Sequence, residues 1–288
     1  MLRCGQTLVL AGCFSGEGED NAWILKAGKI PEASSGYQCN AEEADSRIWR
    51  HATQTPYTHI LIYSPDTDVY NIGLGVIQET SKQYVIQLNV PHAAEKKFLN
   101  LNRLESVLYN DPDLASLPRT SIVNIMQTLF ICTGCDYVSY FKSIGKSTFF
   151  NLFFQYAEFV CGVNMPGCLN ETNPDNRESG FLAFIRLVGT AYFKKHLAAF
   201  SSLYNHETPL HLFNSIDSSL SDQERHHKWL QTIRSVVADR ITSEEERVPS
   251  FTSLWRHWLR SCWISQLWQF SNLSDVSSSP RAEWVASK

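Results

Sequence analysis

Two aspartates separated by one residue are the first side chains in this sequence whose spacing suggests chemistry. They follow the apolar run Ile60–Tyr63 in the stretch "HILIYSPDTDVYNIG", residues 59–73. A short apolar run that ends in Ser-Pro predicts a buried strand. Residues two apart along a strand point to the same face, so continued strand geometry would bring the carboxylates of Asp66 and Asp68 together. They would meet at the C-terminal edge of the sheet, where open α/β folds bind ligands.

Two converging carboxylates repel each other unless a cation or a proton relieves them. Such hard oxygen ligands suit Mg²⁺ or Mn²⁺, which keep several waters and contact phosphate oxygens. A D-x-D sequence is equally explained by carboxylates that cap a turn, and this alternative stays open at this point.

A second acidic group precedes the strand in "AEEADSRIWRHAT", residues 41–53. The pattern predicts a helix with Glu43 and Asp45 in its first turn, and Glu42 as a weaker candidate ligand. A helix that packs on the sheet with the usual handedness would point its N-terminus at the same edge. The alternative is that acidic residues favour any helix N-terminus, with no metal involved.

A third group lies in "ICTGCDYVSYFKSIGKSTFF", residues 131–150, where Asp136 follows an apolar helical run. The Gly-Lys-Ser sequence at 145–147 does not complete a phosphate-binding loop of the G-x-x-x-x-G-K type, because residue 140 is Tyr. A glycine that opens a helix still leaves free N–H groups for a phosphate of a nucleic-acid backbone, and Lys142 and Lys146 flank it. A plain connection between two helices is the alternative.

Together these groups resemble the flap-endonuclease family (5′ nucleases of the XPG type), whose catalytic domain is PIN-like. In that family an E-A-E opens a helix, a D-x-D ends the next strand, and a G-[SC]-D-Y precedes an I-G-x-[KR] turn. The four motifs occur here in that order, within residues 40–160, as Glu43-Ala44-Asp45, Asp66-Thr67-Asp68, Gly134-Cys135-Asp136-Tyr137 and Ile144-Gly145-Lys146-Ser147.

The resemblance implies a Mg²⁺- or Mn²⁺-dependent nuclease with a two-metal site that acts on structured DNA. It assigns catalysis to Asp66, Asp68 and Asp136, and makes Glu43 and Asp45 further metal ligands. It also implies a helix-two-turn-helix in which Lys142, Gly145, Lys146 and Ser147 bind the duplex backbone.

The chain departs from the family pattern at its beginning. The family's first strand carries an Asp, and a following helix carries another carboxylate among basic residues; residues 1–39 show neither. Asp45 also stands where the family has Glu. We therefore expect a domain that lacks its N-terminal part and is a weak or silent nuclease. The alternative is a non-catalytic module, derived from a nuclease, that binds nucleic acid or protein. A phosphatase or a glycosyltransferase that uses the D-x-D is less favoured, because neither explains the motifs at 134–147.

The order of predicted elements indicates an α/β fold: a PIN-like core with a helix-two-turn-helix and an all-helical C-terminal extension. Residues 1–160 would form the partial nuclease domain, 161–270 the helical extension and 271–288 a disordered tail. We expect strands at 7–12, 59–64 and 83–90, and later helices at 146–160, 178–203, 217–240 and 250–270. The tryptophan stripes of the last helix are typical of a core. The half from 161 onward resembles, loosely, uncharacterised frames associated with mobile elements.

Composition limits the partners and the compartment. The net charge is 25 − 29 = −4, so DNA contact must come from local groups or from metal ions. No stretch approaches the roughly 18 apolar residues of a membrane span. The eight cysteines show no disulfide or zinc framework, which favours free thiols in a reducing compartment, the nucleus ahead of the cytoplasm.

Overall fold

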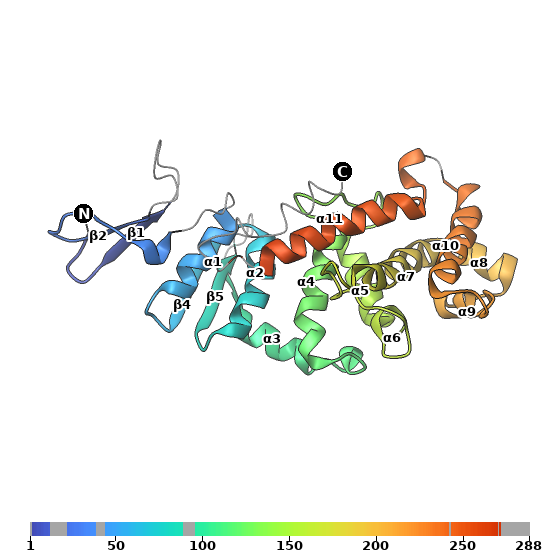
Figure 1. Ribbon diagram of the computed structural model, residues 1–288, viewed down its shortest axis with the longest axis horizontal. Helices are drawn as coiled ribbons and strands as arrows, with labels where there is room; N and C mark the ends of the chain where they lie inside the picture. The colour runs from blue at the N-terminus through green and yellow to red at the C-terminus, as the bar shows by residue number, and fades with distance from the viewer. Residues whose placement is uncertain are drawn as a thin grey trace. The chain divides into compact units, whose positions relative to one another are not determined.

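The computed structural model describes residues 2–11, 22–38, 44–88, 96–241, 243–269 and 271 (Figure 1). It is a mixed α/β structure, with many helices and two small sheets of three strands each. The chain divides into two compact units, residues 1–105 with 266–288, and residues 106–265. The predicted α/β class is confirmed at this level. The predicted domain boundary at residue 160 lies inside the second unit, because the helices on both sides of it share one core.

The first unit holds both sheets and the helices around them. Its elements in chain order are β1 (Thr7–Ala11), β2 (Ala22–Lys26), β3 (Glu32–Ala33), the 3₁₀ turn η1 (Ser35–Tyr37), α1 (Ala44–Gln54), β4 (His59–Ser64), α2 (Thr67–Val76), the 3₁₀ turn η2 (Ile77–Glu79), β5 (Gln83–Leu88) and β6 (Lys97–Asn100). α3 (Leu101–Tyr109) crosses the division into the second unit.

The sheet β4-β5-β6 carries the predicted D-x-D at the end of one strand. β4 and β5 are parallel and α2 connects them, whereas β6 returns antiparallel to β5. Ile62, Tyr84 and Ile86 are buried on one face of this sheet, while Leu61 and Tyr63 of β4 remain exposed on the other. This alternation is that of a sheet with one covered face.

α1 and α2 pack closely because one position on α2 has no side chain. Trp49 of α1 is fully buried and its Nε1 donates a hydrogen bond to the carbonyl of Val69, at 2.7 Å. A Cβ at Gly73 of α2 would lie 2.1 Å from the Trp49 ring. Glycine at this position therefore lets the tryptophan fill the space between the helices.

The second unit is helical. It contains two 3₁₀ turns, η3 (Pro112–Leu114) and η4 (Arg119–Ser121), followed by α4 (Ile122–Cys132), α5 (Lys146–Gln155), α6 (Ala157–Cys161), α7 (Arg177–Lys195), α8 (Leu197–Tyr204), α9 (Pro209–Asn214), α10 (Asp222–Ala238), the 3₁₀ turn η5 (Glu244–Glu246) and α11 (Phe251–Gln269). Its core is one hydrophobic cluster, to which α4 and α7 each contribute several buried residues.

Several predicted helices are confirmed, with differences at their ends. The helix expected at 146–160 is divided into α5 and α6 at Tyr156, and the one expected at 178–203 into α7 and α8 at His196. Both dividing residues have φ near −120° and ψ of 26°, which interrupts the helical hydrogen bonds. The apolar pattern continues through each break, which is why the sequence suggested one helix.

The tryptophan stripe of α11 is part of the core, as predicted. Leu254, Trp258 and Cys262 are buried, whereas Arg256 and Arg260 are exposed. Trp258 donates a hydrogen bond from Nε1 to the carbonyl of Arg177, at 2.7 Å, so its one polar atom is satisfied inside the unit.

Two strands that the sequence analysis did not predict, β2 and β3, pair with β1 as an antiparallel sheet. The predicted tail 271–288 lies outside the described residues except for Ser271. In the described part of the chain, no helix combines the length and apolar character needed to cross a membrane.

Candidate functional site

Asp66 and Asp68 lie at the C-terminal end of β4, but they do not continue its strand geometry. The strand ends at Ser64, and α2 begins at Thr67. Asp66 is the N-cap of α2, and its Oδ1 accepts a hydrogen bond from the backbone N–H of Asp68 at 2.9 Å. The expected convergence along a strand is therefore wrong: Pro65 cannot donate to a ladder, and the cap satisfies an otherwise unpaired N–H of the helix.

The second D-x-D in the chain adopts the same capping arrangement. Asp111 precedes η3, and its Oδ1 accepts from the N–H of Asp113, also at 2.9 Å. Capping thus accounts for the local geometry of both sequences. At the first one a carboxylate pair still follows the end of β4, an edge strand of its sheet, where burial and the charges of Asp68 and Asp66 raise the pKa of Tyr70.

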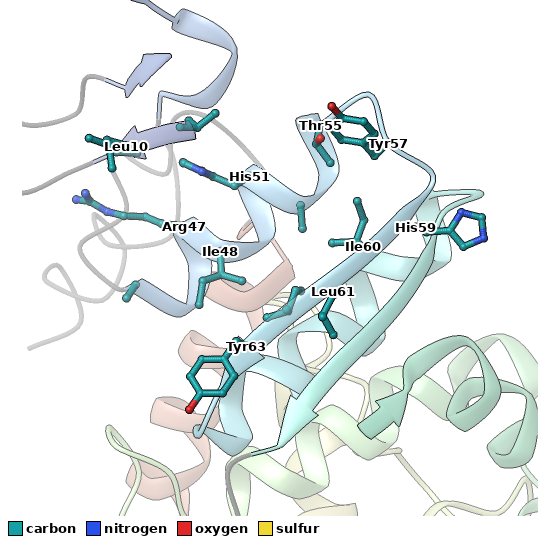
Figure 2. A pocket seen from close by; sticks show the side chains of 15 residues that line it. Leu10, Arg47, Ile48, His51, Thr55, Tyr57, His59, Ile60, Leu61 and Tyr63 are labelled. Atoms are coloured by element: carbon teal, nitrogen blue, oxygen red, sulfur yellow. The ribbon is translucent and has the colours of Figure 1, made fainter. Parts of the chain in front are cut away.

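The acidic helix start reaches the same end of this layer. Asp45 is half-buried in the first turn of α1. Figure 2 shows α1 running antiparallel to β4, with Ile48 toward the Tyr63 end of the strand and Thr55 at the opposite end. Asp45 is in the first turn of α1 and Asp66 follows β4, and their convergence on one metal site stays a prediction.

The complete ligand set stays a prediction. Glu42 and Glu43 lie outside the described residues. Among the described residues, no group of three or more His, Cys, Asp or Glu side chains is close enough to hold a metal ion. Asp136 is an exposed residue of the second unit, whereas Asp45, Asp66 and Asp68 belong to the first.

A cavity of about 780 Å³ lies between β1, α1 and β4 in the first unit (Figure 2). Leu10, Ile48 and Ile60 give it an apolar lining, with Arg47 and His51 at its side. Burial lowers the pKa of His51, so this side chain is neutral at pH 7. No described carboxylate lines the cavity, so its described lining does not offer the ligands of a Mg²⁺ site.

The segment between α4 and α5, residues 133–145, consists of two consecutive β-turns. In the first, Cys135 and Val138 exchange backbone hydrogen bonds at 2.9 and 3.1 Å. In the second, the N–H of Ile144 donates to the carbonyl of Phe141 at 3.2 Å. We call residues 135–144 the two-turn segment.

The two-turn segment buries every third residue and exposes the others. Val138, Phe141 and Ile144 are buried, which anchors both turns on the core of the second unit. The turn tips, Asp136-Tyr137 and Lys142-Ser143, are exposed. Tyr140 between the turns has 77% of its surface exposed, so the segment presents an aromatic ring as well as polar tips to solvent.

α5 begins directly after the second turn without a side-chain cap. Its N-cap is Gly145, which is exposed, and Ser147 in its first turn is exposed as well. A helix N-terminus carries a partial positive charge and N–H groups that are not paired within the helix. Such a terminus can accept an anion, and the phosphate contact expected at residues 145–147 stays a prediction.

Lys146 contacts the protein itself. Its Nζ donates hydrogen bonds to the carbonyls of Phe130, at 3.0 Å, and Gly134, and lies 3.1 Å from the centroid of the Phe130 ring. These carbonyls are at the C-terminal end of α4, where a cation is favoured. In this arrangement Lys146 joins α4 to α5, and its ammonium is turned away from the exposed turn tips.

Lys142 and Ser143, at the tip of the second turn, contact an acidic segment a hundred residues later. Lys142 Nζ lies 3.4 Å from Glu245 Oε2, and Ser143 Oγ donates to Glu246 Oε1 at 2.6 Å. The Ser143 hydrogen bond and the charge of Lys195 lower the pKa of Glu246. The sequence did not indicate a role for Glu245 and Glu246, because the run "SEEER" carries no signal of which surface it contacts.

Comparison of the chain with known protein families, with curated proteins and with solved structures found no match. The likeness to flap endonucleases therefore stays a prediction that rests on the four sequence motifs and the local geometry described above.

Proposed function

We propose that this chain binds the sugar–phosphate backbone of structured DNA through the two-turn segment and the N-terminus of α5. The observation that carries the proposal is the pair of consecutive turns between α4 and α5, followed by a glycine that opens the second helix. This is the local arrangement expected of a helix-two-turn-helix, on a chain whose other motifs suggest a PIN-like core.

The chemistry of the exposed side supports a backbone contact. Lys142, whose exposed ion pair is with Glu245, supplies a cation, and Ser147 supplies a hydroxyl donor at the open N-terminus of α5. Phosphate oxygens are bound by this combination of lysine, hydroxyl groups and helix N–H groups. Because the net charge of the chain is −4, affinity must come from this local group, and binding should be independent of base sequence.

Lys146 receives a different role from the one that the resemblance implies. Its ammonium is engaged by the α4 carbonyls, so we propose that it holds the two helices at the spacing that the two-turn segment requires. A double substitution of Lys142 and Lys146 would therefore mix a folding defect with a loss of DNA contact. Lys142 by itself is the cleaner probe.

The test compares Lys142→Ala with Lys228→Ala, an exposed lysine on α10 of the same unit. We expect Lys142→Ala to weaken binding of a branched duplex for all sequences and to reduce the slope of log affinity against log salt by about one unit. Lys228→Ala should leave the slope unchanged. Equal slopes of log affinity against log salt in wild type and Lys142→Ala would show that this turn does not contact DNA.

A second candidate function, metal-dependent cleavage of phosphodiesters, is supported by the nuclease-like motifs at 43–45, 66–68 and 134–137 and by the Asp66 and Asp68 carboxylates that follow β4. In a two-metal site, Mg²⁺ or Mn²⁺ ions activate the attacking water and stabilise the leaving oxygen. Asp66 uses one oxygen as a helix cap and keeps the other for an ion. With the family's N-terminal carboxylates unmatched, we propose weak or silent cleavage. DNA binding would place the chain in the nucleus.

A further inference from the structure

Two thiols of the second unit lie together at the end of α6. Cys161 is the last residue of α6 and is buried, and Cys168, in the loop that leads to α7, is half-buried. The two thiols are close enough for each to shift the pKa of the other. The Cys161 Sγ also accepts the backbone N–H of Leu169 at 3.3 Å.

A buried arginine fixes the two chain segments that carry these cysteines. Arg186 of α7 is fully buried, and its Nη2 donates to the carbonyl of Val160 at 2.7 Å and to that of Gly167 at 2.9 Å. Val160 immediately precedes Cys161, and Gly167 immediately precedes Cys168. One guanidinium group thus holds the backbone on the N-terminal side of both thiols.

The charge of Arg186 has no carboxylate partner among the described residues. Its Nη1 donates instead to Nε2 of His226 at 2.7 Å, and the other ring nitrogen of His226 lies 2.6 Å from the carbonyl of Asp222. This pattern requires a neutral His226, because a protonated ring has no acceptor. A buried cation without a counter-ion favours a negative charge nearby, and the adjacent thiols are groups that can supply it.

The two thiols are not equivalent. The hydrogen bond from Cys161 lowers the pKa of Cys168, whereas complete burial raises the pKa of Cys161. Cys168 is also the more exposed of the pair. A thiolate with access to solvent is the nucleophile in thiol oxidation, and a neighbouring thiol is what resolves the product.

We propose that Cys161 and Cys168 form a redox-active dithiol, which a hydroperoxide oxidises to an intramolecular disulfide. The Cys168 thiolate attacks the peroxide, an S–O bond forms as the O–O bond breaks, and the released hydroxide takes up a proton to become water. The Cys161 sulfur then attacks the Cys168 sulfenic acid, forming the S–S bond and releasing a second water. Two thiols and one hydrogen peroxide thus give one disulfide and two waters.

The chain contains its own control pair. Cys132 and Cys135 form the C-x-x-C that sequence alone would single out. Cys132 is fully buried in α4, and burial strongly raises the pKa of its thiol. The side chain therefore stays protonated, and we expect this pair to react slowly although it has the redox-like sequence spacing.

The experiment treats the folded, reduced full-length chain with hydrogen peroxide, blocks the remaining thiols with N-ethylmaleimide in denaturant, and maps tryptic peptides by mass. Residues 147–177 form one tryptic peptide with both Cys161 and Cys168, and residues 120–142 form another with Cys132 and Cys135. We expect the first peptide to lose two hydrogens about tenfold faster than the second, or more. Oxidation of Met165 in the same peptide adds an oxygen and is distinguished by mass.

Two variants assign the chemistry. Cys161→Ser should abolish the disulfide and leave a sulfenic acid at Cys168 that dimedone labels, whereas Cys135→Ser should leave the disulfide unchanged. Labelling of both Cys161 and Cys168 by maleimide after peroxide treatment of the folded wild type would overturn the proposal. So would equal oxidation rates of the two tryptic peptides, because the thiols would then react without help from their surroundings.

Discussion

At the scale of single residues, the structure gives several polar side chains of the candidate site a structural role. Asp66 caps α2, and Lys146 caps the C-terminal end of α4. Both residues belong to motifs that resemble those of nucleases. A cap and a ligand need the same chemistry, a carboxylate near N–H groups or a cation near carbonyls, so residue type by itself does not separate the two roles.

Lys146→Met tests the structural role of this lysine. The variant keeps the apolar stem over Phe130 but leaves the carbonyls of Phe130 and Gly134 without their cationic donor. We expect the free energy of unfolding in urea to fall by about 1–3 kcal/mol, because hydrogen bonds to a charged group are lost. Lys142→Met, with its exposed ion pair, should change stability by roughly 0–1 kcal/mol. Equal effects of the two substitutions would contradict this assignment.

His226 makes the stability of the second unit depend on pH. Burial, together with the charge of Arg186, lowers the pKa of His226 to about 4. Below its ordinary pKa of about 6.5 the unfolded chain binds a proton that the folded chain does not, so stability falls as the pH drops toward 4, by up to about 1.4 kcal/mol per pH unit. His226→Gln keeps an acceptor for Arg186 and should reduce the change in melting temperature between pH 7 and pH 4.5. An unchanged profile would assign the acid sensitivity to other groups.

At the scale of elements, the acidic turn η5 contacts the surface that we propose for DNA. The Glu245 carboxylate pairs with Lys142, and the Glu246 carboxylate accepts a hydrogen bond from Ser143. Both carboxylates therefore occupy positions where phosphate oxygens would bind. Removing both charges by substitution with Gln should raise the affinity for duplex DNA, by about three- to tenfold at low salt. Glu244→Gln removes one charge from the same turn, but Glu244 pairs only with Arg247, so this control should have a much smaller effect. A similar gain in both variants would indicate a general charge effect.

At the scale of the whole molecule, the remaining question is whether the carboxylates of the chain hold metal ions and cleave DNA. We expect Mn²⁺ to raise the melting temperature, because binding to the folded state alone stabilises it by mass action. Cleavage of a labelled flap substrate should be weak and should disappear in Asp66→Asn. Asparagine keeps the N-cap acceptor, so this variant removes charge without removing the cap.

Asp111→Asn is the matched control, because Asp111 has the same capping bond before η3 and is not one of the predicted metal ligands. Robust cleavage by wild type that Asp66→Asn abolishes would show that the unmatched N-terminal carboxylates are dispensable. The absence of both a melting shift and cleavage would favour the non-catalytic module. In that case, the comparison of DNA affinity between Lys142→Ala and wild type tests independently whether the module binds DNA.

The sequence by itself determined the elements that depend on local hydrogen bonds and periodicity. The apolar run at 59–64 forms β4, and the apolar pattern at 121–134 forms α4. In the Asp-Pro-Asp turn, Asp111 is the N-cap of η3. The sequence also indicated two helices joined through residues 135–145, because Gly134 and Gly145 punctuate that stretch. It did not show that α2 begins at Thr67, since strand continuation and capping fit the same residues equally well.

Only the tertiary structure decided which polar groups meet across long stretches of chain. Ser143 and Glu246 are 103 residues apart, and Arg186 and His226 are 40 apart. Cys161 and Cys168 are near in sequence but belong to a helix end and a loop, and Arg186 of a later helix holds the two segments together. Such contacts follow from how helices pack around a shared core, and no local periodicity records them. The sequence pattern therefore indicates the two-turn segment itself, but not Glu245 and Glu246, which contact it.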